Sequence, residues 1–315
     1  MNRTTYGLDL TKRVFQVHWV DIDTGEVKRR TLRRGEVLRF FALQPGSVVA
    51  MEACGSAHYW GRALTNLGHD VKLIAAQFVR PFVKTNKTDT ADAQAIWEAA
   101  QRPEMRRVAL KTVEQQAVLG LHRVRQQLVK QRTMHANQVR GLLYEFGVVM
   151  PQGWKKLLAE AGQLLADDDQ VAVPKPLAEV MGKQLSSIQS LSERIDALER
   201  RIGLWQRGDV ECQRISAIPG VGPLSATAVI ATIGNANGFR SGRELAAFFG
   251  LVPRQSGTGG RVKLLGISKR GDPYVRTLLI HAARSVLVAQ TRNGREPDPW
   301  VKQLLGRRPW NVVLN

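Results

Sequence analysis

Four carboxylates are the residues of this chain best suited to do chemistry. Asp9 lies in the apolar run "TYGLDL", and Glu52 ends the run "VVAME". Asp89 and Asp92 are three residues apart in "NKTDTADAQAI", which places their side chains on one face of a helix. A carboxylate in apolar surroundings is costly unless it is paired or bound to metal. The four acids together therefore predict a site where two divalent cations hold the oxygens of a phosphodiester.

The ions expected at this site are Mg²⁺ or Mn²⁺, because both prefer oxygen ligands. The two cysteines, Cys54 and Cys212, and the six histidines show no spacing typical of a zinc site. The Asp pair alone has a second interpretation, in which Asp89 caps a helix and Asp92 adds a favourable charge to its first turn. That interpretation stays open for the pair, whereas the order of all four acids favours a metal site.

The composition predicts a polyanionic partner. Lys and Arg number 46 against 27 Asp and Glu, which gives a formal net charge of +19. A chain of this charge is expected to bind DNA or RNA. It has no apolar run of roughly 18 residues that could span a bilayer, and its N-terminus lacks the apolar stretch of a signal peptide. We therefore expect no membrane partner and a cytoplasmic protein that lies at the nucleoid when it acts.

Residues 1–108 must position the acids, and their pattern predicts an α/β domain with a mixed sheet. Short β-rich runs alternate with apolar helical stretches. The charged run at 27–34 indicates an edge strand. Strands are expected at 5–10, 13–22, 27–34, 46–53 and 69–76, and helices at 56–68 and 89–100.

Residues 109–208 are expected to form a helical region. An apolar stripe over 111–147 and a heptad-like seam over 177–205 each predict a long helix, with a linker between them. The pair predicts either an antiparallel helical hairpin or an oligomerising coiled coil. The first helix is basic, and its candidate nucleic-acid contacts are Arg123, Arg125, Lys130 and Arg132.

Residues 209–315 are expected to form a basic, mostly helical C-terminal domain with two phosphate-binding stretches. "IPGVGPLSA" resembles the hairpin of a helix-hairpin-helix motif, in which Gly220 and Gly222 would let backbone amides approach a phosphate. An ordinary glycine-rich turn between helices is the alternative. "GISKRGDPYVR" adds Lys269 and Arg270 as a patch for the nucleic-acid backbone.

Ser256 is the candidate nucleophile. It lies in "PRQSGTGG", which is expected to be a flexible loop where no helix starts for the serine to cap. A hydroxyl among cations could attack a phosphate, although a basic glycine loop more often only binds one. The neighbouring residues expected to contact nucleic acid are Arg254, Thr258, Arg261 and Lys263.

Six stretches together resemble the DEDD transposases of bacterial insertion sequences. They are "YGLDLTK", "MEACGSAHYW", "NKTDTADA", "IPGVGPLSA", "FFGLVPRQSGTGG" and "LLGISKRGDPYVRTLLIHAAR". The resemblance is to the IS110 family, with a C-terminal loop like that of its IS1111 subgroup, and it covers nearly the whole chain. It implies an RNase-H-like N-terminal domain akin to Holliday-junction resolvases (1–108), a helical coiled-coil region (109–208) and a C-terminal transposase domain (209–315).

The resemblance implies that the four acids are the metal ligands and that a serine of the C-terminal domain forms a covalent link to DNA. Ser256 is the matching serine. The chain has Gly257 where the common family form has the serine, so the nucleophile is either Ser256, shifted by one position, or Thr258. Related chains also continue with one more helix after the position of "RRPWNVVLN".

The resemblance further implies a structured non-coding guide RNA, made from the element itself, that pairs with donor and target DNA. It implies homodimers or homotetramers whose active sites combine two subunits. The basic helix is then a candidate for RNA contact, and Lys84 and Lys87 would hold the backbone beside the acids. The expected function is Mg²⁺-dependent DNA cleavage and rejoining through a phosphoserine link. The alternatives are a junction-resolving nuclease that uses water and a non-catalytic nucleic-acid-binding protein.

Overall fold

The computed structural model describes residues 3–83, 89–166, 173–292, 294 and 296–314. The chain divides into two compact units, Met1–Thr112 and Val113–Asn315. Among the described residues, no helix is both long enough and apolar enough to cross a membrane.

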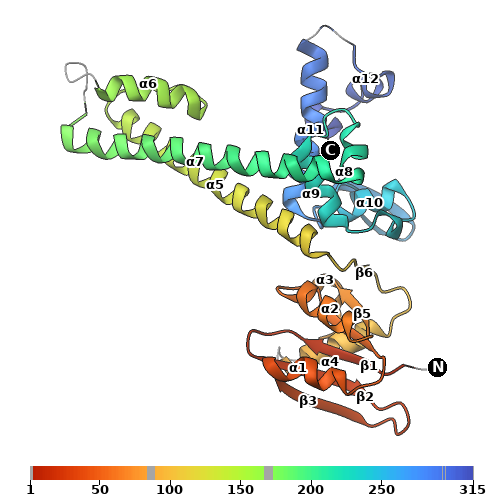
Figure 1. Ribbon diagram of the computed structural model, residues 1–315. Coiled ribbons are helices and arrows are strands. Elements are labelled where there is room, and N and C mark those ends of the chain that lie inside the picture. The colour runs from red at the N-terminus through yellow and green to blue at the C-terminus, as the bar shows by residue number, and fades with distance from the viewer. Residues whose placement is uncertain (1–2, 84–88, 167–172, 293, 295, 315) are drawn as a thin grey trace. The chain divides into compact units, whose positions relative to one another are not determined.

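The N-terminal unit is built on a six-stranded sheet with the order β3-β2-β1-β4-β5-β6 (Figure 1). β1 (Thr5–Asp9), β2 (Val14–Val20) and β3 (Val27–Arg33) form an antiparallel meander. β4 (Val48–Glu52) runs parallel to β1, and β5 (Asp70–Ile74) runs parallel to β4. β6 (Arg107–Val108) pairs with β5. The predicted mixed sheet, with 27–34 as an edge strand, is confirmed.

The described residues of this unit also form α1 (Val37–Ala42), α2 (Ala57–Asn66), α3 (Ala76–Val79) and α4 (Asp89–Ala100). Single 3₁₀ turns lie at Arg34–Glu36 and Arg80–Phe82. The helices at 56–68 and 89–100 were predicted. α1 and α3 were not, because six and four residues are too few to show a helical period.

Strand alternation divides the core between the two faces of the sheet. Tyr6 and Leu8 of β1 are buried on one face, in a cluster with Trp60 and Leu64 of α2. On the other face Ala50 and Ile74 pack with residues of α4. Gly7 of β1 also lies on this second face, directly beneath α4. Asp9, two residues further along, therefore shares the face that α4 covers.

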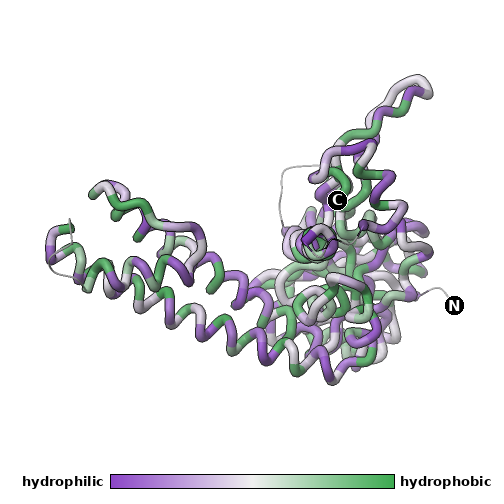
Figure 2. The backbone as a smooth tube through the Cα atoms, turned by 90° about the horizontal axis from the view of Figure 1, so that it is seen from above, coloured by the Kyte–Doolittle hydropathy of each residue, from purple (hydrophilic) through white to green (hydrophobic). Residues whose placement is uncertain are grey.

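A pair of long helices dominates the C-terminal unit (Figure 1). α5 (Val113–Glu145) and α7 (Lys175–Gly208) pack together, and the contacts Arg125–Glu199 and Arg132–Ser192 show that they run antiparallel. α6 (Trp154–Ala166) packs against both helices. Hydrophobic and hydrophilic segments alternate along the pair (Figure 2). The predicted antiparallel hairpin is present within the chain, and oligomerisation through these helices stays a prediction.

The remaining elements are mostly helical. They are α8 (Val210–Ser216), α9 (Pro223–Ile233), a 3₁₀ turn (Ala236–Gly238), α10 (Gly242–Phe248), α11 (Pro273–Arg292), α12 (Pro299–Leu305) and α13 (Trp310–Val313). The contact pattern groups them with the long helices in one unit. A finer boundary between residues 109–208 and 209–315 stays a prediction.

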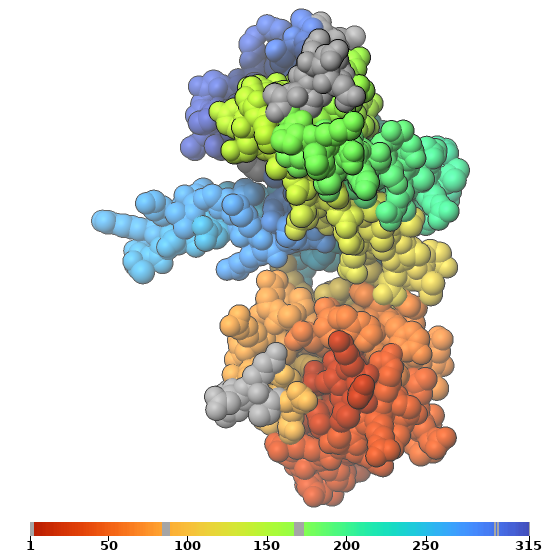
Figure 3. Space-filling model, turned by 90° about the vertical axis from the view of Figure 1, so that its left-hand side faces the viewer, coloured from red at the N-terminus to blue at the C-terminus, as the bar shows by residue number. Residues whose placement is uncertain are grey.

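The stretch predicted to be a flexible glycine loop is instead a β-hairpin, so that prediction was wrong. β7 (Pro253–Thr258) pairs with β8 (Arg261–Ile267), and the hairpin projects from the rest of its unit (light blue in Figure 3). Gly259 and Gly260 link the strands with φ of +57° and +79°. Two-residue hairpin turns of this kind need positive φ at both positions, which glycine adopts without strain. Gly259 and Gly260 therefore form the tight turn of a hairpin and do not make this stretch a flexible loop.

Candidate metal centre and nucleic-acid-binding residues

Asp9 and Glu52 lie at the ends of neighbouring parallel strands. The β1–β4 register pairs Leu8 with Met51, so the next residue of each strand, Asp9 and Glu52, reaches the same edge of the sheet. Because Leu8 and Met51 are fully buried on the α2 face, alternation places both acids on the α4 face. The carboxyl ends of parallel strands are where open α/β sheets commonly bind ligands.

α4 brings the other two acids to this edge. Asp89 is the first residue of α4 and Asp92 lies in the same turn. One carboxylate oxygen each of Asp9, Asp89 and Asp92 lies within 4.8 Å of the other two. A divalent cation with oxygen ligands at about 2.0–2.6 Å fits such a group. The structure thus brings three of the four predicted acids together, with Glu52 beside them on the neighbouring strand.

The electrostatics of Asp9 reflect this crowding. Its burial, followed by the negative charges of Asp92, Asp89 and Glu52, raises its pKa from 3.8 to about 6. None of these acids forms an ion pair with a cation in the part of the chain that the structure describes. Lys84 and Lys87, which were predicted to hold a nucleic-acid backbone here, lie outside the described residues. Carboxylates crowded together in this way favour a bound cation.

Gly7 is a residue of this site that the sequence interpretation missed. A Cβ atom at Gly7 would lie 2.2 Å from the carbonyl oxygen of Ala93 and 2.8 Å from Cβ of Trp97. The backbone of α4 therefore lies directly on β1, and this contact fixes the height of the first turn of α4 above Asp9. A glycine two residues before a strand-end acid was the available signal, since glycine in a strand often marks close backbone approach.

Ser256 lies on an exposed strand among cations. It pairs across the hairpin with Lys263, and Thr258 pairs with Arg261. Cross-strand partners share a face, and so do residues two apart, so both hydroxyls and both cations lie on one face. Arg254 is exposed at an irregularity of the ladder between Pro253 and Gln255, where the alternation does not hold. The choice between Ser256 and Thr258 stays open.

Gly257 has a structural reason to be glycine in this hairpin. A Cβ atom there would lie 2.2 Å from the carbonyl oxygen of Arg261. A side chain at 257 would therefore push the two strands apart. Glycine at 257 therefore allows the close approach of the two strands.

Two of the predicted nucleic-acid contacts on α5 are engaged within the protein. Arg125 forms an ion pair of 2.6 Å with Glu199 of α7. Arg132 stacks on the ring of Trp154 at 4.6 Å and donates a hydrogen bond to Ser192. Both arginines therefore hold the helices together. The other two, Arg123 and Lys130, are exposed.

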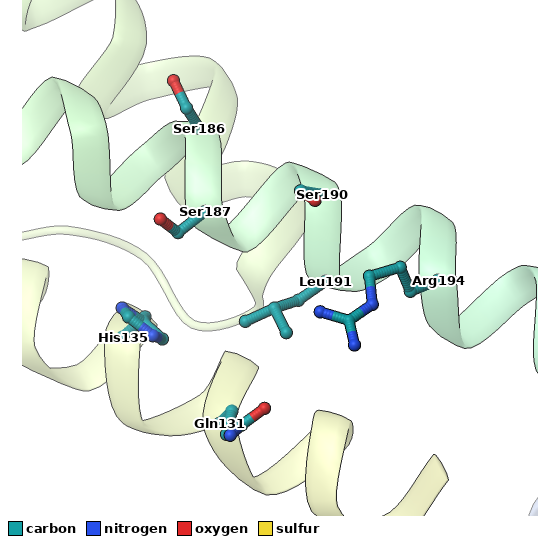
Figure 4. Close-up of a pocket in the computed structure, with 7 residues that line it drawn as sticks. All are labelled: Gln131, His135, Ser186, Ser187, Ser190, Leu191 and Arg194. Atoms are coloured by element: carbon teal, nitrogen blue, oxygen red, sulfur yellow. The ribbon is translucent and has the colours of Figure 1, made fainter. Parts of the chain in front are cut away.

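A polar pocket of about 460 Å³ lies between α5 and α7, and no pattern in the sequence predicted it. Figure 4 shows Arg194 reaching into the space between the helices. Arg194 has no ion-pair or hydrogen-bond partner among the described residues. Hydroxyls, an amide and a cation are groups that can bind a phosphate or a ribose hydroxyl. The lining residues are Gln131 and His135 of α5 and Ser186, Ser187, Ser190, Leu191 and Arg194 of α7.

The glycines of "IPGVGPLSA" lie between α8 and α9. Gly220 has a φ of +83°, and a Cβ atom there would lie 2.5 Å from the carbonyl oxygen of Ala282 in α11. Gly220 therefore has a packing role, whereas Gly222 is the N-cap of α9 and is open to solvent on its Cβ side. Lys269 and Arg270 are exposed just before α11. The roles of these residues toward phosphate stay predictions.

His122 forms a second polar cluster, inside the C-terminal unit. Its Nε2 lies 2.9 Å from Oγ1 of Thr227, and its Nδ1 lies 2.9 Å from the hydroxyl of Tyr274. Thr227 donates its own proton to the carbonyl of Pro223, so its oxygen accepts from His122 Nε2–H. Burial, followed by the positive charge of Arg125, lowers the pKa of His122 to about 4. The neutral ring thus joins α5, α9 and α11.

Comparison with known proteins identifies the family of the chain. A family model described as "Transposase IS116/IS110/IS902 family" matches residues 212–297. A model of DEDD transposases of the IS110 type, described as "Transposase", matches residues 6–147, which include all four acids.

Full-length relatives carry the same description. A "Probable family 20 transposase" of Pseudomonas aeruginosa is 50% identical over 313 residues, covering 99% of this chain and 93% of the relative. The "Transposase for insertion sequence element IS1111A" of Coxiella burnetii is 42% identical, covering 97% and 84%. The corresponding transposase of IS1328 from Yersinia enterocolitica is 39% identical, covering 99% and 92%.

Transposases act on DNA, and the DEDD type takes a divalent metal cofactor, whose preference for oxygen ligands the acid cluster fits. The chain therefore belongs to the IS116/IS110/IS902 family and is a DNA transposase of a bacterial insertion sequence.

Proposed function

We propose that this transposase cleaves and rejoins DNA with Mg²⁺ held by Asp9, Glu52, Asp89 and Asp92. The observation that carries this proposal is the meeting of three carboxylates within 4.8 Å, with Glu52 on the adjacent strand. Because Asp89 is exposed while Asp9 and Asp92 are half-buried, the cluster is open to a DNA phosphate on one side. The strand order β3-β2-β1-β4-β5 supports an RNase-H-like domain.

The residues of the cluster have separate tasks in this proposal. Asp9 and Glu52 are fixed by the sheet, and the two acids of α4 are fixed through the contact of that helix with Gly7. Bound Mg²⁺ would supply Lewis acidity at the phosphate and stabilise the charge on the attacking and leaving oxygens. The rigid strand ends and the helix turn keep the ligands at constant separation, which limits the reorganisation that each turnover requires.

We further propose that Ser256 forms the covalent link to DNA. Its Oγ attacks the phosphorus of the scissile phosphodiester, its proton passes to solvent, and the DNA sugar oxygen leaves with the bonding electron pair. A strand hydroxyl then attacks the phosphoserine, which restores Ser256 and one phosphodiester bond. The exposed cationic face of the hairpin supports this role, since Lys263 lies directly across from Ser256. Thr258 lies on the same face and is the alternative nucleophile.

Donor and target DNA would be selected by an element-encoded guide RNA, with homodimers or homotetramers as the active species. The α5–α7 pair is the proposed RNA contact, because Arg123 and Lys130 are exposed on α5 and the polar pocket opens between the helices (Figure 4). Coiled-coil pairing between subunits along the same helices is the proposed route to the oligomer. Exposed apolar residues on this pair, such as Met134, Tyr144 and Leu204, support that role.

The test of the metal assignment is strand cleavage with and without Mg²⁺. Asp89→Asn should lower the cleavage rate at least about 100-fold, which corresponds to roughly 3 kcal/mol of lost transition-state stabilisation. DNA affinity measured in EDTA should be kept. Asp23→Asn is the matched control, because Asp23 is an exposed acid in the turn between β2 and β3. Equal cleavage by Asp89→Asn and the wild type refutes the assignment.

The test of the nucleophile is a protein–DNA adduct that survives denaturation. The adduct should be lost in Ser256→Ala and kept in Thr258→Ala. The reverse pattern assigns the role to Thr258. A second candidate function, hydrolysis by water without a covalent step, is favoured by one observation: the acid cluster is formed within the N-terminal unit alone. That function predicts free cut ends and no adduct from any variant.

A further inference from the structure

Three cations lie at the same edge of the sheet as the acid cluster. Lys12 and Arg13 are in the turn that follows Asp9, and Arg33 ends β3. Because β2 is antiparallel to both neighbours, its first residue, Val14, pairs with Arg33 at this edge. The amide of Arg34 donates to the carbonyl of Arg13 over 2.9 Å, which ties the end of β3 to the turn. We call Lys12, Arg13 and Arg33 the edge cations.

The strand register also places Arg33 on the face of the sheet that carries Asp9. Leu32 is buried in the core beneath α2, so its neighbour Arg33 lies on the opposite face, which is the face of Asp9. Across that face Asp9 pairs with Gln16, and Gln16 pairs with Thr31. Two strand spacings separate β1 from β3 by about 10 Å. One strand of a duplex spans that distance in about three nucleotides, at roughly 3.4 Å each.

The side chains of the edge cations differ from those of the neighbouring cations in their contacts. In β3, Lys28 is bonded to Asp21, Arg29 donates to Gln94, and Arg30 stacks on Phe40. Arg34, which directly follows β3, stacks on Trp60. Lys12, Arg13 and Arg33 are exposed, and none of their side chains has an ion-pair or ring partner within the described residues.

Protection of an edge strand against aggregation accounts for charges along β3. It does not account for Lys12 and Arg13, which lie in a turn between two interior strands. Over residues 10–14 and 31–36 there are four cations and a single acid, Glu36. A positive patch beside a cluster of carboxylates suits a phosphate backbone that crosses a metal site.

We infer that the edge cations bind the DNA backbone one to three nucleotides from the phosphate held at the acid cluster, and so set the path of the strand across β1, β2 and β3. This inference rests on the proposed function, because it takes the acid cluster as the place of cleavage. The edge cations act on position rather than on chemistry. They contact neighbouring phosphates and carry no sequence information.

The test compares the wild type with the double variant Arg13→Ala/Arg33→Ala in the full-length protein. Affinity for a labelled DNA duplex of mixed sequence is measured in EDTA over a range of salt concentrations. Each lost phosphate contact reduces the magnitude of the slope of log K against log salt concentration by about 0.9. The slope of the double variant should therefore be smaller in magnitude than that of the wild type by about 1.8. Arg13→Lys/Arg33→Lys should keep the wild-type slope, because lysine also pairs with phosphate as a point charge.

Arg3→Ala is the matched control. Arg3 is an exposed cation of the same unit, but it precedes β1 and therefore lies at the opposite edge of the sheet. Its removal should leave the slope unchanged. Thermal unfolding should be the same for all variants, since the substituted side chains are exposed.

Three outcomes overturn the inference. They are a wild-type slope in the double variant, a loss of slope equal to that of Arg3→Ala, and a loss seen with an RNA hairpin but not with the DNA duplex. The failure of this inference can be told apart from the failure of the proposed function, because binding is measured in EDTA, where no cleavage occurs. Suppose that the double variant has a reduced slope and that the wild type does not cut DNA in Mg²⁺. Those results support the backbone contact and refute only the proposed function.

Discussion

The acid cluster and the His122 cluster contrast in how their polar groups are satisfied. At the acid cluster Asp9 meets two further carboxylates within 4.8 Å, and its burial, together with these negative charges, raises its pKa to about 6. At the other cluster, each nitrogen of His122 has a partner at 2.9 Å, and the ring stays neutral with a pKa of about 4. The acid cluster gathers several negative charges, whereas the His122 cluster holds an uncharged ring whose hydrogen bonds are satisfied.

The difference separates a binding site from an architectural one. A satisfied buried network rigidifies the elements that meet in it, here α5, α9 and α11. A cluster of like charges weakens the fold that contains it, and persists where a ligand of opposite charge is bound. The two clusters should therefore respond in opposite ways to pH and to cations.

The largest expected effect is acid destabilisation through His122. Its pKa in the folded chain is lowered to about 4 from 6.5, so between those values the unfolded chain binds a proton that the folded chain does not. The free energy of unfolding therefore falls as pH falls from 6.5 toward 4. At about 1.4 kcal/mol per pH unit, the contribution reaches up to about 3 kcal/mol.

Urea unfolding of the wild type and of His122→Gln at a series of pH values measures this contribution. Hydrogen exchange in α5, α9 and α11 separates the C-terminal unit from the other. Glutamine keeps a donor and an acceptor but does not titrate. The variant should be less stable at pH 7 and lose less stability on acidification. Identical pH dependence in both proteins would remove His122 from this role.

The next effect concerns the packing of α4 on β1. Gly7→Ala introduces a Cβ atom 2.2 Å from a backbone oxygen, and overpacking of this kind costs about 3 kcal/mol. We expect lower thermal stability of the N-terminal unit and loss of Mg²⁺-dependent cleavage. Gly35→Ala is the control, because a Cβ atom at Gly35 meets nothing within 4 Å. Unchanged stability in Gly7→Ala would contradict the close helix–strand contact.

A third prediction is stabilisation by divalent cations, confined to the acid cluster. A cation at 100 times its Kd stabilises the unit that binds it by about 2.7 kcal/mol. Thermal unfolding with MnCl₂ or MgCl₂ should show this shift in the wild type. In Asp92→Asn the shift should be much smaller, and in Asp23→Asn it should remain. Hydrogen exchange around His122 should not respond, and an equal response there would break the contrast between the two clusters.

The smallest effect is a gain of stability on removing one charge. The raised pKa of Asp9 means that the folded chain holds a proton more tightly than the unfolded chain, so without metal its stability falls as pH rises from 3.8 past 6. Asp9→Asn removes this repulsion. After a discount for solvent screening of a half-exposed group, the gain is roughly 1–2 kcal/mol at pH 7. Unfolding in EDTA at pH 5 and pH 7 measures it, and a destabilised variant at both pH values would contradict it.

The sequence by itself determined the elements and the residue types of the metal site. Asp9 and Glu52 end apolar strand-like runs, and the spacing of Asp89 and Asp92 requires only that residues 89–100 form a helix. These are local properties, because the periods of strands and helices can be recognised from residues that are close together in the sequence. The edge position of residues 27–34 followed for the same reason.

Only the tertiary structure decided which residues meet. That α4 lies on β1 depends on Gly7, whose lack of a side chain matters only once a helix is laid against it. The pocket between α5 and α7 depends likewise on packing between distant segments. The hairpin at Ser256 pairs residues that are close in sequence, and it was missed because its turn glycines were interpreted as part of a flexible loop. The sequence predicted Arg125 and Arg132 to be exposed cations that contact nucleic acid. In the structure Arg125 pairs with Glu199 and Arg132 stacks on Trp154, and both partners lie far along the chain. Contacts between segments that are far apart in the sequence produce no periodic pattern of residues, because they depend on how those segments pack together in three dimensions.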